Sequence, residues 1–485
     1  MSRQSQVTSE IDSSRGGRTT AAFFDFDGTL IAGYSVTPFL KRRLLSGTMP
    51  PREALQQLFT ICSYGLGQSD FLDVLQESAA ALRGASDRMM RELAEQVFEK
   101  DLSADVYPES IALIDAHRRK GHTIVLVSSA TQYQVESVAA SLDIDNVVCT
   151  RLEVEDGALT GRIAGPAVYG AGKLEAAREF AGNTGLDLGK SFFYTDGSED
   201  IPLLEAVGRP RPINPDRKLS AHADRERWPV QTFSSRGLPT LTDIARTSLV
   251  YGSLIPSVAV GLPAWLLNQS RRELANIAIS TWGDFGSAVA GLDISVEGEE
   301  HIWSQRPAVF IFNHQSASDA LIISRLLRRD FTGVAKAEMK SNPLVGSVLQ
   351  AIGTVFIDRS DRDKAVDALA PAVESLQNGV SFAIAPEGTR SSMYKLGPFK
   401  KGAFHIAMQA GVPIVPIIIA NSSDSLPKAA FFLRPARIDV TVLPPIQTQG
   451  WSADTIDSHI DTIRGMFLDV LGQSAESDVK LRRVK

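Results

Sequence analysis

Two aspartates separated by one phenylalanine follow the first apolar run of the chain, in the stretch AAFFDFDGTL. Asp25 and Asp27 are two positions apart, and side chains at i and i+2 of a strand leave on the same side. We therefore expect both carboxylates beyond the carboxyl end of a buried strand, where open α/β sheets place their ligands. Two carboxylates that close repel each other unless a cation lies between them, and Mg²⁺ prefers oxygen ligands.

Later segments supply the groups that such a site needs to handle a phosphate. The strand-like run TIVLVSS contains Ser128, whose hydroxyl can donate to a phosphoryl oxygen, as can that of Thr29. Lys173 can neutralise the charge on a phosphate and on a nucleophile. The run FFYTDGSED ends another strand in Asp196, which would complete the metal site, and Asp200 is close enough to support it or Lys173.

These pieces, in this order, resemble the haloacid dehalogenase superfamily of phosphatases over about residues 20–216. The helical stretch after the first strand resembles the cap of the phosphoserine-phosphatase-like branch. The resemblance implies a Rossmann-like fold and Mg²⁺ held by Asp25, Asp27 and Asp196. It also implies that Asp25 attacks phosphorus and forms an aspartyl phosphate, while Asp27 protonates the leaving group and then activates water.

The chain departs from the phosphoserine phosphatases at three places. The residues IAGYSVTPF that follow the aspartate motif lack the Glu that commonly holds the substrate amine. Ser128 is followed by Ser129 and Ala130 where glycines are common, and Gly197 stands where Ser is common. The catalytic set is intact, but these departures weaken an assignment to phosphoserine.

A histidine and an aspartate with the spacing H-x4-D follow another apolar run, AVFIFNHQSASD. Within one helix, five residues correspond to about 500° of rotation, which would leave His314 and Asp319 about 140° apart. A contact between them therefore requires His314 to lie at or before the start of the helix. Asp319 could then accept from Nδ1 and leave Nε2 as a general base for a hydroxyl that the substrate brings.

Later strands supply matching groups for this second site. Arg359 and Arg390 are expected at strand ends, where guanidinium groups suit a bidentate grip on a phosphate. Glu387, Gly388 and Thr389 precede Arg390 in the run AIAPEGTRS. We expect Glu387 to orient a glycerol hydroxyl or Arg390 rather than to bind a metal.

The blocks NHQSASD, GTVFIDR, PEGTR and VPIVP resemble the 1-acylglycerol-3-phosphate acyltransferases over roughly residues 280–450. The resemblance implies acyl transfer from acyl-CoA or acyl carrier protein to the free hydroxyl of lysophosphatidic acid. It implies that His314 deprotonates that hydroxyl, that Asp319 orients His314, and that Arg359 and Arg390 hold the glycerol phosphate. The family also carries membrane-dipping helices just before its histidine motif.

The stretch from Thr247 to Ser270 contains no charged residue, and Arg246 and Arg271 flank it. Its length could span a bilayer, which needs about 20 apolar residues. Pro256 and Pro263 argue against one straight helix, because proline removes a helical hydrogen bond. A kinked or re-entrant segment in one leaflet fits this pattern, and the alternative is the buried helical hairpin of a soluble protein.

The 485 residues are too many for one ordinary core, and alternating strands and helices predict parallel sheets in two α/β domains. With 44% hydrophobic and 22% charged residues and a net charge of −6, the composition is globular and does not indicate nucleic acid as a partner. Cys62 and Cys149 lack CxxC spacing, so a zinc site or a disulfide framework is not expected.

The predicted segments are a disordered cytoplasmic leader (1–20), a phosphatase-like domain (21–232, helical cap at about 36–105), a linker (233–247), a membrane-associated helical segment (248–295), an acyltransferase domain (296–470) and a basic tail (471–485).

These features together predict a lysophosphatidate acyltransferase at the cytoplasmic face of the cell membrane, fused to a Mg²⁺-dependent phosphomonoester hydrolase. Its partners would be lysophosphatidic acid, an acyl donor, a small or lipid phosphomonoester and the membrane surface. Two alternatives stay open for the first domain, a lipid phosphatase acting on phosphatidic or lysophosphatidic acid and an inactive regulatory or docking module.

Overall fold

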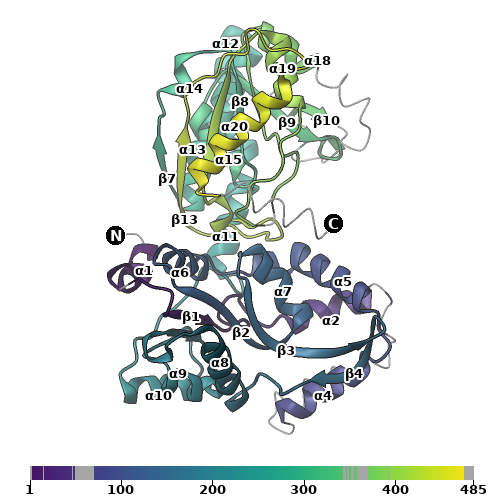
Figure 1. Cartoon of the computed structure of the whole chain (residues 1–485). Coiled ribbons are helices and arrows are strands. Elements are labelled where there is room, and N and C mark those ends of the chain that lie inside the picture. Colours follow the sequence, from purple (N-terminus) through teal and green to yellow (C-terminus); the bar gives the residue numbers. More distant parts are fainter. Residues whose placement is uncertain are drawn as a thin grey trace. The chain divides into compact units, whose positions relative to one another are not determined.

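The chain divides into two compact units, Met1–Leu238 and Pro239–Lys485. The computed structural model describes residues 3–14, 16–45, 47, 49, 70–341, 346, 349–350, 354–357, 370–391 and 393–473. Both units are α/β, as the sequence predicts, and each is described by itself below (Figure 1).

The first unit is built on a sheet with the strand order β4-β3-β2-β1-β5-β6. All neighbouring strands run parallel except β3 and β4, which form an antiparallel hairpin. The strands are β1 (Ala21–Phe24), β2 (Thr123–Thr131), β3 (Asn146–Glu155), β4 (Ala158–Ala164), β5 (Phe192–Thr195) and β6 (Arg209–Pro212). The central strands β1 and β5 are buried along their whole length, which explains their unbroken apolar sequences.

Helices surround this sheet and extend one end of it. They are α1 (Arg3–Ser13), α2 (Val36–Leu45), α4 (Phe71–Ala81), α5 (Asp87–Lys100), α6 (Pro108–Arg119), α7 (Gln132–Ser141), α8 (Ala171–Thr184), α9 (Ile201–Ala206) and α10 (Arg217–Glu226), with short 3₁₀ turns η1 (Leu102–Ala104), η2 (Leu188–Lys190) and η3 (Ser198–Asp200). Helices α2, α4 and α5 lie in the stretch predicted to form a helical cap, and residues 51–69 of that stretch lie outside the described residues. Helix α4 packs on β4, so the β3–β4 hairpin, which the sequence did not reveal, joins the cap.

The prediction that residues 1–20 are a disordered leader is wrong for helix α1. This helix packs on α6, with Ile11 buried. The carboxylate of Glu10 pairs with the guanidinium of Arg211 on β6. An ion pair and one buried isoleucine fix a segment whose sequence is otherwise polar, and neither partner is recognisable from the local sequence.

The second unit contains a sheet with the order β10-β9-β11-β8-β12-β13-β7. Only the β12–β13 pair is antiparallel. The strands are β7 (Leu292–Glu297), β8 (Val309–Phe312), β9 (Phe331–Lys336), β10 (Val355–Ile357), β11 (Ser381–Ile384), β12 (Ile414–Ile419) and β13 (Ala436–Val442). The helices are α11 (Leu241–Gly252), α12 (Leu254–Asn268), α13 (Arg271–Ala290), α14 (His301–Ser304), α15 (Asp319–Leu327), α18 (Ala370–Gln377), α19 (Gly402–Ala410) and α20 (Ile456–Leu471), with 3₁₀ turns η4 (Ala337–Ser341) and η5 (Ser422–Asp424).

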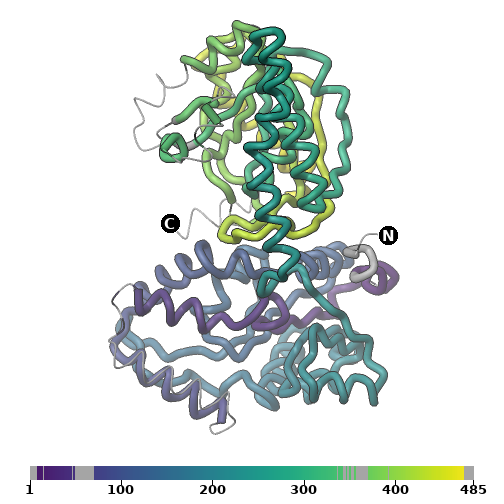
Figure 2. The backbone as a smooth tube through the Cα atoms, turned by 180° about the vertical axis from the view of Figure 1, so that it is seen from behind, coloured from purple at the N-terminus to yellow at the C-terminus, as the bar shows by residue number. Residues whose placement is uncertain are grey.

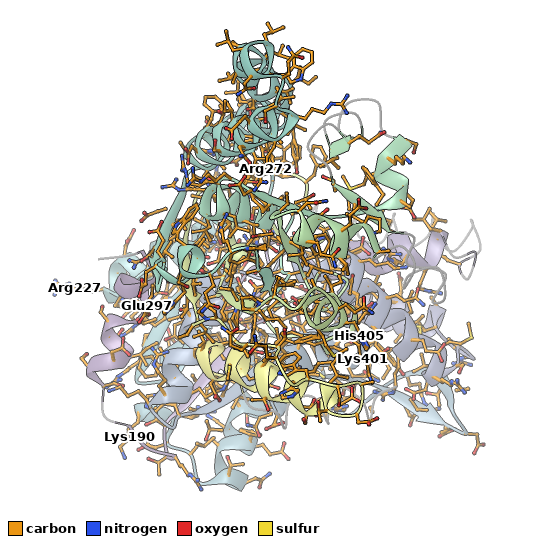
Figure 3. The ribbon with its side chains drawn as sticks, turned by 90° about the horizontal axis from the view of Figure 1, so that it is seen from above. Lys190, Arg227, Arg272, Glu297, Lys401 and His405 are labelled. Atoms are coloured by element: carbon orange, nitrogen blue, oxygen red, sulfur yellow. The ribbon has the colours of Figure 1, made fainter. Side chains whose placement is uncertain are left out.

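Two apolar cores lie on the two faces of this sheet. One contains Leu321 and Leu326 of α15, with Trp282 of α13 packed against it, and the other contains Phe404 of α19 and Phe467 of α20. Figures 2 and 3 show α13 and α12 on one side of the sheet and α20 on the other, with α12 outermost.

Two predicted boundaries shift in the structure. Helix α11 begins at Leu241, inside the stretch predicted as linker, because Thr240 and Asp243 form a capping box there. The membrane-associated segment was predicted to run to residue 295, but β7 begins at Leu292 and pairs with β13. Helix α13 also packs closely on the body of the unit, where Gly283 leaves no room for a side chain beside Arg325 of α15.

Candidate active sites

The first site lies at the carboxyl edge of the β2-β1-β5 sheet. Phe24 at the end of β1 is aligned with Leu126 of β2 and Tyr194 of β5, so the residues that follow these three strands share one edge. The N–H of Asp25 donates to the carbonyl of Tyr194 at 2.9 Å, which fixes the aspartate at the mouth of the sheet. The predicted strand-end position of Asp25 is therefore correct.

A buried ion cluster surrounds Asp25. The ammonium of Lys173, near the start of α8, lies 3.0 Å from Asp25 Oδ1 and 2.7 Å from Asp200 Oδ2. Lys173 is 2% exposed and Asp200 is fully buried. Burial opposes the charge of Lys173, but the carboxylates of Asp200 and Asp25 outweigh it, and the pKa of the lysine is raised. Thr195 at the end of β5, which the sequence analysis missed, donates to Asp200 at 2.6 Å.

The carboxylate of Asp196 lies close to the backbone of Gly28, at the edge of this cluster. Burial, reinforced by the negative charges of Asp25 and Glu199, raises the pKa of Asp196 to about 8. Gly28 has φ +73°, and a Cβ placed there would lie 2.0 Å from Asp196 Oδ2. Glycine is therefore needed both for the left-handed turn and for the close approach of the carboxylate. The hydroxyl of Thr29 points to Asp196 Oδ1 at 3.4 Å.

The charge balance of the cluster suits a divalent cation. Burial, with Asp200 reinforcing it and Lys173 opposing it, raises the pKa of Asp25 to about 7, and Asp200 Oδ1 has no hydrogen-bond partner among the described residues. Three carboxylates therefore face one lysine, and the negative charge in excess is what Mg²⁺ would neutralise. In the described part of the chain no three acidic, histidine or cysteine side chains are already gathered at metal-binding distance, so Asp25 and Asp196 are the candidates for direct contact.

The sequence analysis expected strand alternation to direct Asp27 to the same side as Asp25. Strand β1 ends at Phe24, so Asp27 lies beyond the strand and this alternation does not apply to it. Its Oδ1 accepts from the backbone N–H of Ser35 at 2.8 Å and its Oδ2 accepts from the Ser35 hydroxyl at 3.2 Å. Burial raises the pKa of Asp27 to about 6, and the Ser35 hydrogen bonds oppose that rise. This carboxyl can carry a proton near neutral pH, while its metal ligation stays a prediction.

Ser128 is positioned on the strand next to Asp25. It follows Leu126, the partner of Phe24, by two residues and is 1% exposed. Its Oγ accepts from the N–H of Ala130 at 3.1 Å, where the β2–β3 pairing is irregular. The hydroxyl proton therefore remains available to a phosphoryl oxygen at this edge of the sheet.

The second site lies at the carboxyl end of β8. His314 Nδ1 lies 2.7 Å from Asp319 Oδ2. Helix α15 begins at Asp319, so the prediction that His314 precedes the helix is confirmed. The same Oδ2 accepts from the N–H groups of Gln315 and Ser316, each at 3.0 Å. An oxygen that accepts three hydrogen bonds requires Nδ1 to be the protonated nitrogen, so Nε2 is the nitrogen free to accept a proton.

Both oxygens of Glu387 accept from the main chain. Its Oε1 accepts from the backbone N–H of His314 at 2.7 Å, and its Oε2 accepts from the N–H of Gly397 at 2.8 Å. Burial raises its pKa to about 6. Glu387 therefore fixes the main chain next to the histidine, and its role in orienting Arg390 or a glycerol hydroxyl stays a prediction.

The remaining predicted residues, except Arg359, belong to the PEGTR segment, which lies beside the His314–Asp319 pair. Gly388 adopts φ +72° with the Lys400 ammonium close by, Thr389 is exposed and Arg390 is half-buried. The next residue, Ser391, donates its N–H to the carbonyl of His314 at 2.9 Å, which places the PEGTR segment beside the histidine. Arg359 lies outside the described residues.

Helices α11 and α12 form the apolar segment. Together they cover Leu241–Asn268, the one stretch of the described residues that is long and apolar enough to cross a membrane, and an 18-residue window within it has a mean hydropathy of 1.6. The helices meet at Ser253, while Pro263 lies inside α12. Leu266 is 64% exposed and Leu267 is 88% exposed. Helix α12 therefore keeps a large apolar surface uncovered in the described chain, which the alternative of a buried helical hairpin does not predict.

Comparison with known proteins gives two family matches. A haloacid dehalogenase-like hydrolase model matches residues 22–205, and an acyltransferase model matches residues 293–420. The chain is 35% identical over 219 residues to a 1-acyl-sn-glycerol-3-phosphate acyltransferase of Limnanthes douglasii, covering 44% of this chain and 77% of the relative. The chain belongs to both families.

Two further relatives extend this comparison. A probable phosphatase of Mycobacterium tuberculosis is 34% identical over 218 residues, covering 44% of this chain and 76% of that protein. An "inhibition of morphological differentiation protein" of Streptomyces azureus is 33% identical over 269 residues, covering 53% of this chain and 96% of the relative. This haloacid dehalogenase-like hydrolase and acyltransferase is thus an enzyme with two catalytic domains.

Proposed function

We propose that the second unit transfers an acyl group from acyl-CoA or acyl carrier protein to the free hydroxyl of 1-acyl-sn-glycerol 3-phosphate. The observation that carries this proposal is the His314–Asp319 pair, with Nδ1 held by a fully buried carboxylate and Nε2 free. His314 takes the proton from the hydroxyl as its oxygen attacks the thioester carbon, and the thiol leaves with a proton. Arg390, together with Arg359, binds the phosphate.

The same proposal places this reaction at a membrane surface, on the cytoplasmic face of the cell membrane. Lysophosphatidic acid is a membrane lipid, so an enzyme that takes its headgroup gains by lying on the bilayer. The exposed leucines of α12 supply an apolar face of the kind that inserts into one leaflet. Burial raises the pKa of Tyr251 on α11 and the positive charge of Arg390 opposes that rise, so the proposed phosphate-binding residue lies within electrostatic range of the apolar segment.

For the first unit we propose Mg²⁺-dependent hydrolysis of a phosphomonoester. Asp25 attacks phosphorus, Asp27 gives a proton to the leaving oxygen, and Asp27 then activates the water that hydrolyses the aspartyl phosphate. Lys173 and Ser128 hold charge and oxygen atoms of the phosphate. Asp25 and Asp196 would hold Mg²⁺, which would supply charge neutralisation, and Asp200 keeps Lys173 in place.

Two assays on purified protein test these proposals. Thiol release from acyl-CoA should depend on lysophosphatidic acid and be lost in His314→Ala; release that survives this substitution contradicts the acyltransferase assignment. Phosphate release should be measured over small phosphomonoesters and over phosphatidic and lysophosphatidic acid in detergent, with Asp25→Asn as control. Turnover of the lipids alone would favour a lipid phosphatase, and no Mg²⁺-dependent turnover over the whole panel would favour a docking module.

A further inference from the structure

A continuous path of hydrogen bonds links the end of β2 to Asp27. Gln134 Oε1 accepts from the backbone N–H and the hydroxyl of Thr131, both at 2.9 Å. Gln134 Nε2 donates to Ser35 Oγ at 2.9 Å, and Ser35 Oγ donates to Asp27 Oδ2 at 3.2 Å. Ser35 is fully buried, so this path is shielded from water at its centre.

The direction of this path is fixed by chemistry. The amide nitrogen of Gln134 can only donate, so Ser35 Oγ must accept there. A hydroxyl has one proton, and that proton is left for Asp27 Oδ2. The backbone N–H of Ser35 holds the other carboxyl oxygen. The Asp27 carboxyl group is therefore held at both oxygens by one residue, whose own hydroxyl is oriented by Gln134.

Ser35 lies where the chain passes from the sheet into the cap. It directly precedes α2, the first cap helix. Immediately before it, the outgoing chain pairs with the returning chain: Ala32 donates to the carbonyl of Asp105 at 2.8 Å, and Tyr107 donates to that of Leu30 at 3.0 Å. Gln134 belongs to α7 of the sheet domain. The path thus joins the cap junction to the strand end that carries Ser128.

We propose that Ser35 and Gln134 are positioning residues that hold the Asp27 carboxyl group on the line of the departing oxygen. This inference rests on the proposed phosphatase function and goes beyond it, because it assigns roles to two residues outside the aspartate, serine and lysine motifs. When the P–O bond breaks, the electron pair stays on the leaving oxygen, which takes the proton from Asp27. A displaced carboxyl group delivers that proton poorly, while attack by Asp25 is unchanged.

Leaving-group dependence separates this role from a structural one. Nitrophenolate departs without a proton, whereas a benzyl alkoxide needs one. In Ser35→Ala, we expect kcat/KM for benzyl phosphate to fall about 10- to 100-fold, part of the 10²–10⁴ that general acid catalysis supplies. The value for p-nitrophenyl phosphate should stay within about threefold. Ser35→Thr, which keeps the hydroxyl, should restore benzyl phosphate turnover.

A second variant acts on the other end of the path. Gln134→Glu keeps the acceptor for Thr131, and Glu suits this capping position as well as Gln does, but the donor to Ser35 is lost. It should show the same selective loss. Ser141→Ala, on the same helix with a hydroxyl that bonds only to the carbonyl of Val138 among the described residues, is the matched control and should leave both substrates unchanged.

The outcomes are distinct. Equal loss on both substrates in Ser35→Ala and Gln134→Glu, or no loss in either, overturns the inference while the proposed phosphatase function stands. If the wild-type protein hydrolyses neither these two esters nor any other member of the phosphomonoester panel in the presence of Mg²⁺, the proposed function fails and the inference fails with it. A selective loss that Ser35→Thr repairs supports both.

Discussion

Both active sites lie at the carboxyl ends of the strands of a mostly parallel sheet, but the balance of charge among their side chains differs. Around Asp25, buried carboxylates outnumber the lysine that faces them, and their pKa values are raised by burial and mutual repulsion. Around His314, hydrogen bonds within the chain hold the histidine in place: Asp319 accepts from its ring Nδ1, and Glu387 accepts from its backbone N–H. In the proposed mechanism the first site needs an external cation to balance its charge, while the His314–Asp319 pair of the second is formed by the chain alone.

The largest expected difference follows from removing the cation. Chelation with EDTA should abolish phosphate release and leave acyl transfer within about twofold. Mg²⁺ should restore the first activity. Assaying both activities in one sample makes each the control for the other, and loss of acyl transfer on chelation would contradict the comparison.

The same cation should change the pH dependence of stability. Without it, Asp25 and Asp196 have folded-state pKa values of about 7 and 8, above their unfolded value of 3.8. The folded state then binds more protons between about pH 4 and pH 8, so the free energy of unfolding falls as the pH rises through this window. Melting temperature measured from pH 5 to 8.5 should decline without Mg²⁺, and Mg²⁺ should raise it most at the alkaline end.

Replacing the lysine sharpens the contrast within the first site. Lys173→Met leaves Asp25 and Asp200 buried without their cation, and breaking a buried pair in this way costs about 3–5 kcal/mol. Phosphate release should fall by about 10³-fold or more. Chemical denaturation should show the first unit unfolding earlier, while acyl transfer persists. Unchanged stability would mean that the ion cluster is not buried as described.

The second site should depend on which ring nitrogen of His314 carries the proton, rather than on the balance between carboxylates and a cation. In Asp319→Asn, the carboxylate that keeps the proton on His314 Nδ1 is gone, and Nε2 no longer stays the basic nitrogen. Acyl transfer should fall by about 10²- to 10⁴-fold, the range of a lost general base. The KM for lysophosphatidic acid should change little, because Asp319 is fully buried and cannot touch that substrate. A variant that loses binding but keeps kcat would contradict this role.

The smallest effect concerns the surface of α12. Replacing Leu266 and Leu267 with serine should lower binding to phosphatidic acid-containing vesicles by at least about tenfold, since burying even one leucine contributes about 1.5–3 kcal/mol. The matched control is Met466→Ser with Val470→Ser on α20, which lies on the opposite face of the sheet (Figure 3). Equal loss in the control pair would mean that α12 is not the membrane-binding face.

The sequence predicted those parts of both sites that follow from strand ends. Asp25 and Asp196 lie directly after buried strands and His314 two residues after one, and a buried apolar run ending in a polar residue is visible without any structure. Thr195, Ser35 and Gln134 were missed because polar residues at strand ends and in the first turns of helices are common everywhere. Their importance appears only in the fold, where Gln134 donates to Ser35, which lies 99 residues away.

The errors have related causes. The sequence did not reveal that Glu387 holds the main chain, because its oxygens accept from backbone N–H groups 73 and 10 residues away. Helix α1 was missed because its anchor is the distant Arg211. The strands β4, β6 and β7 were missed because they are partly exposed, so they lack the continuous apolar run that marked the central strands.

The central claim is that one chain carries two chemically independent catalytic centres. The most direct test measures phosphate release and acyl transfer side by side in wild-type protein, Asp25→Asn and His314→Ala. We predict that Asp25→Asn loses phosphate release and keeps acyl transfer, and that His314→Ala shows the reverse. Either variant losing both activities, or keeping the activity assigned to the substituted residue, would contradict this account.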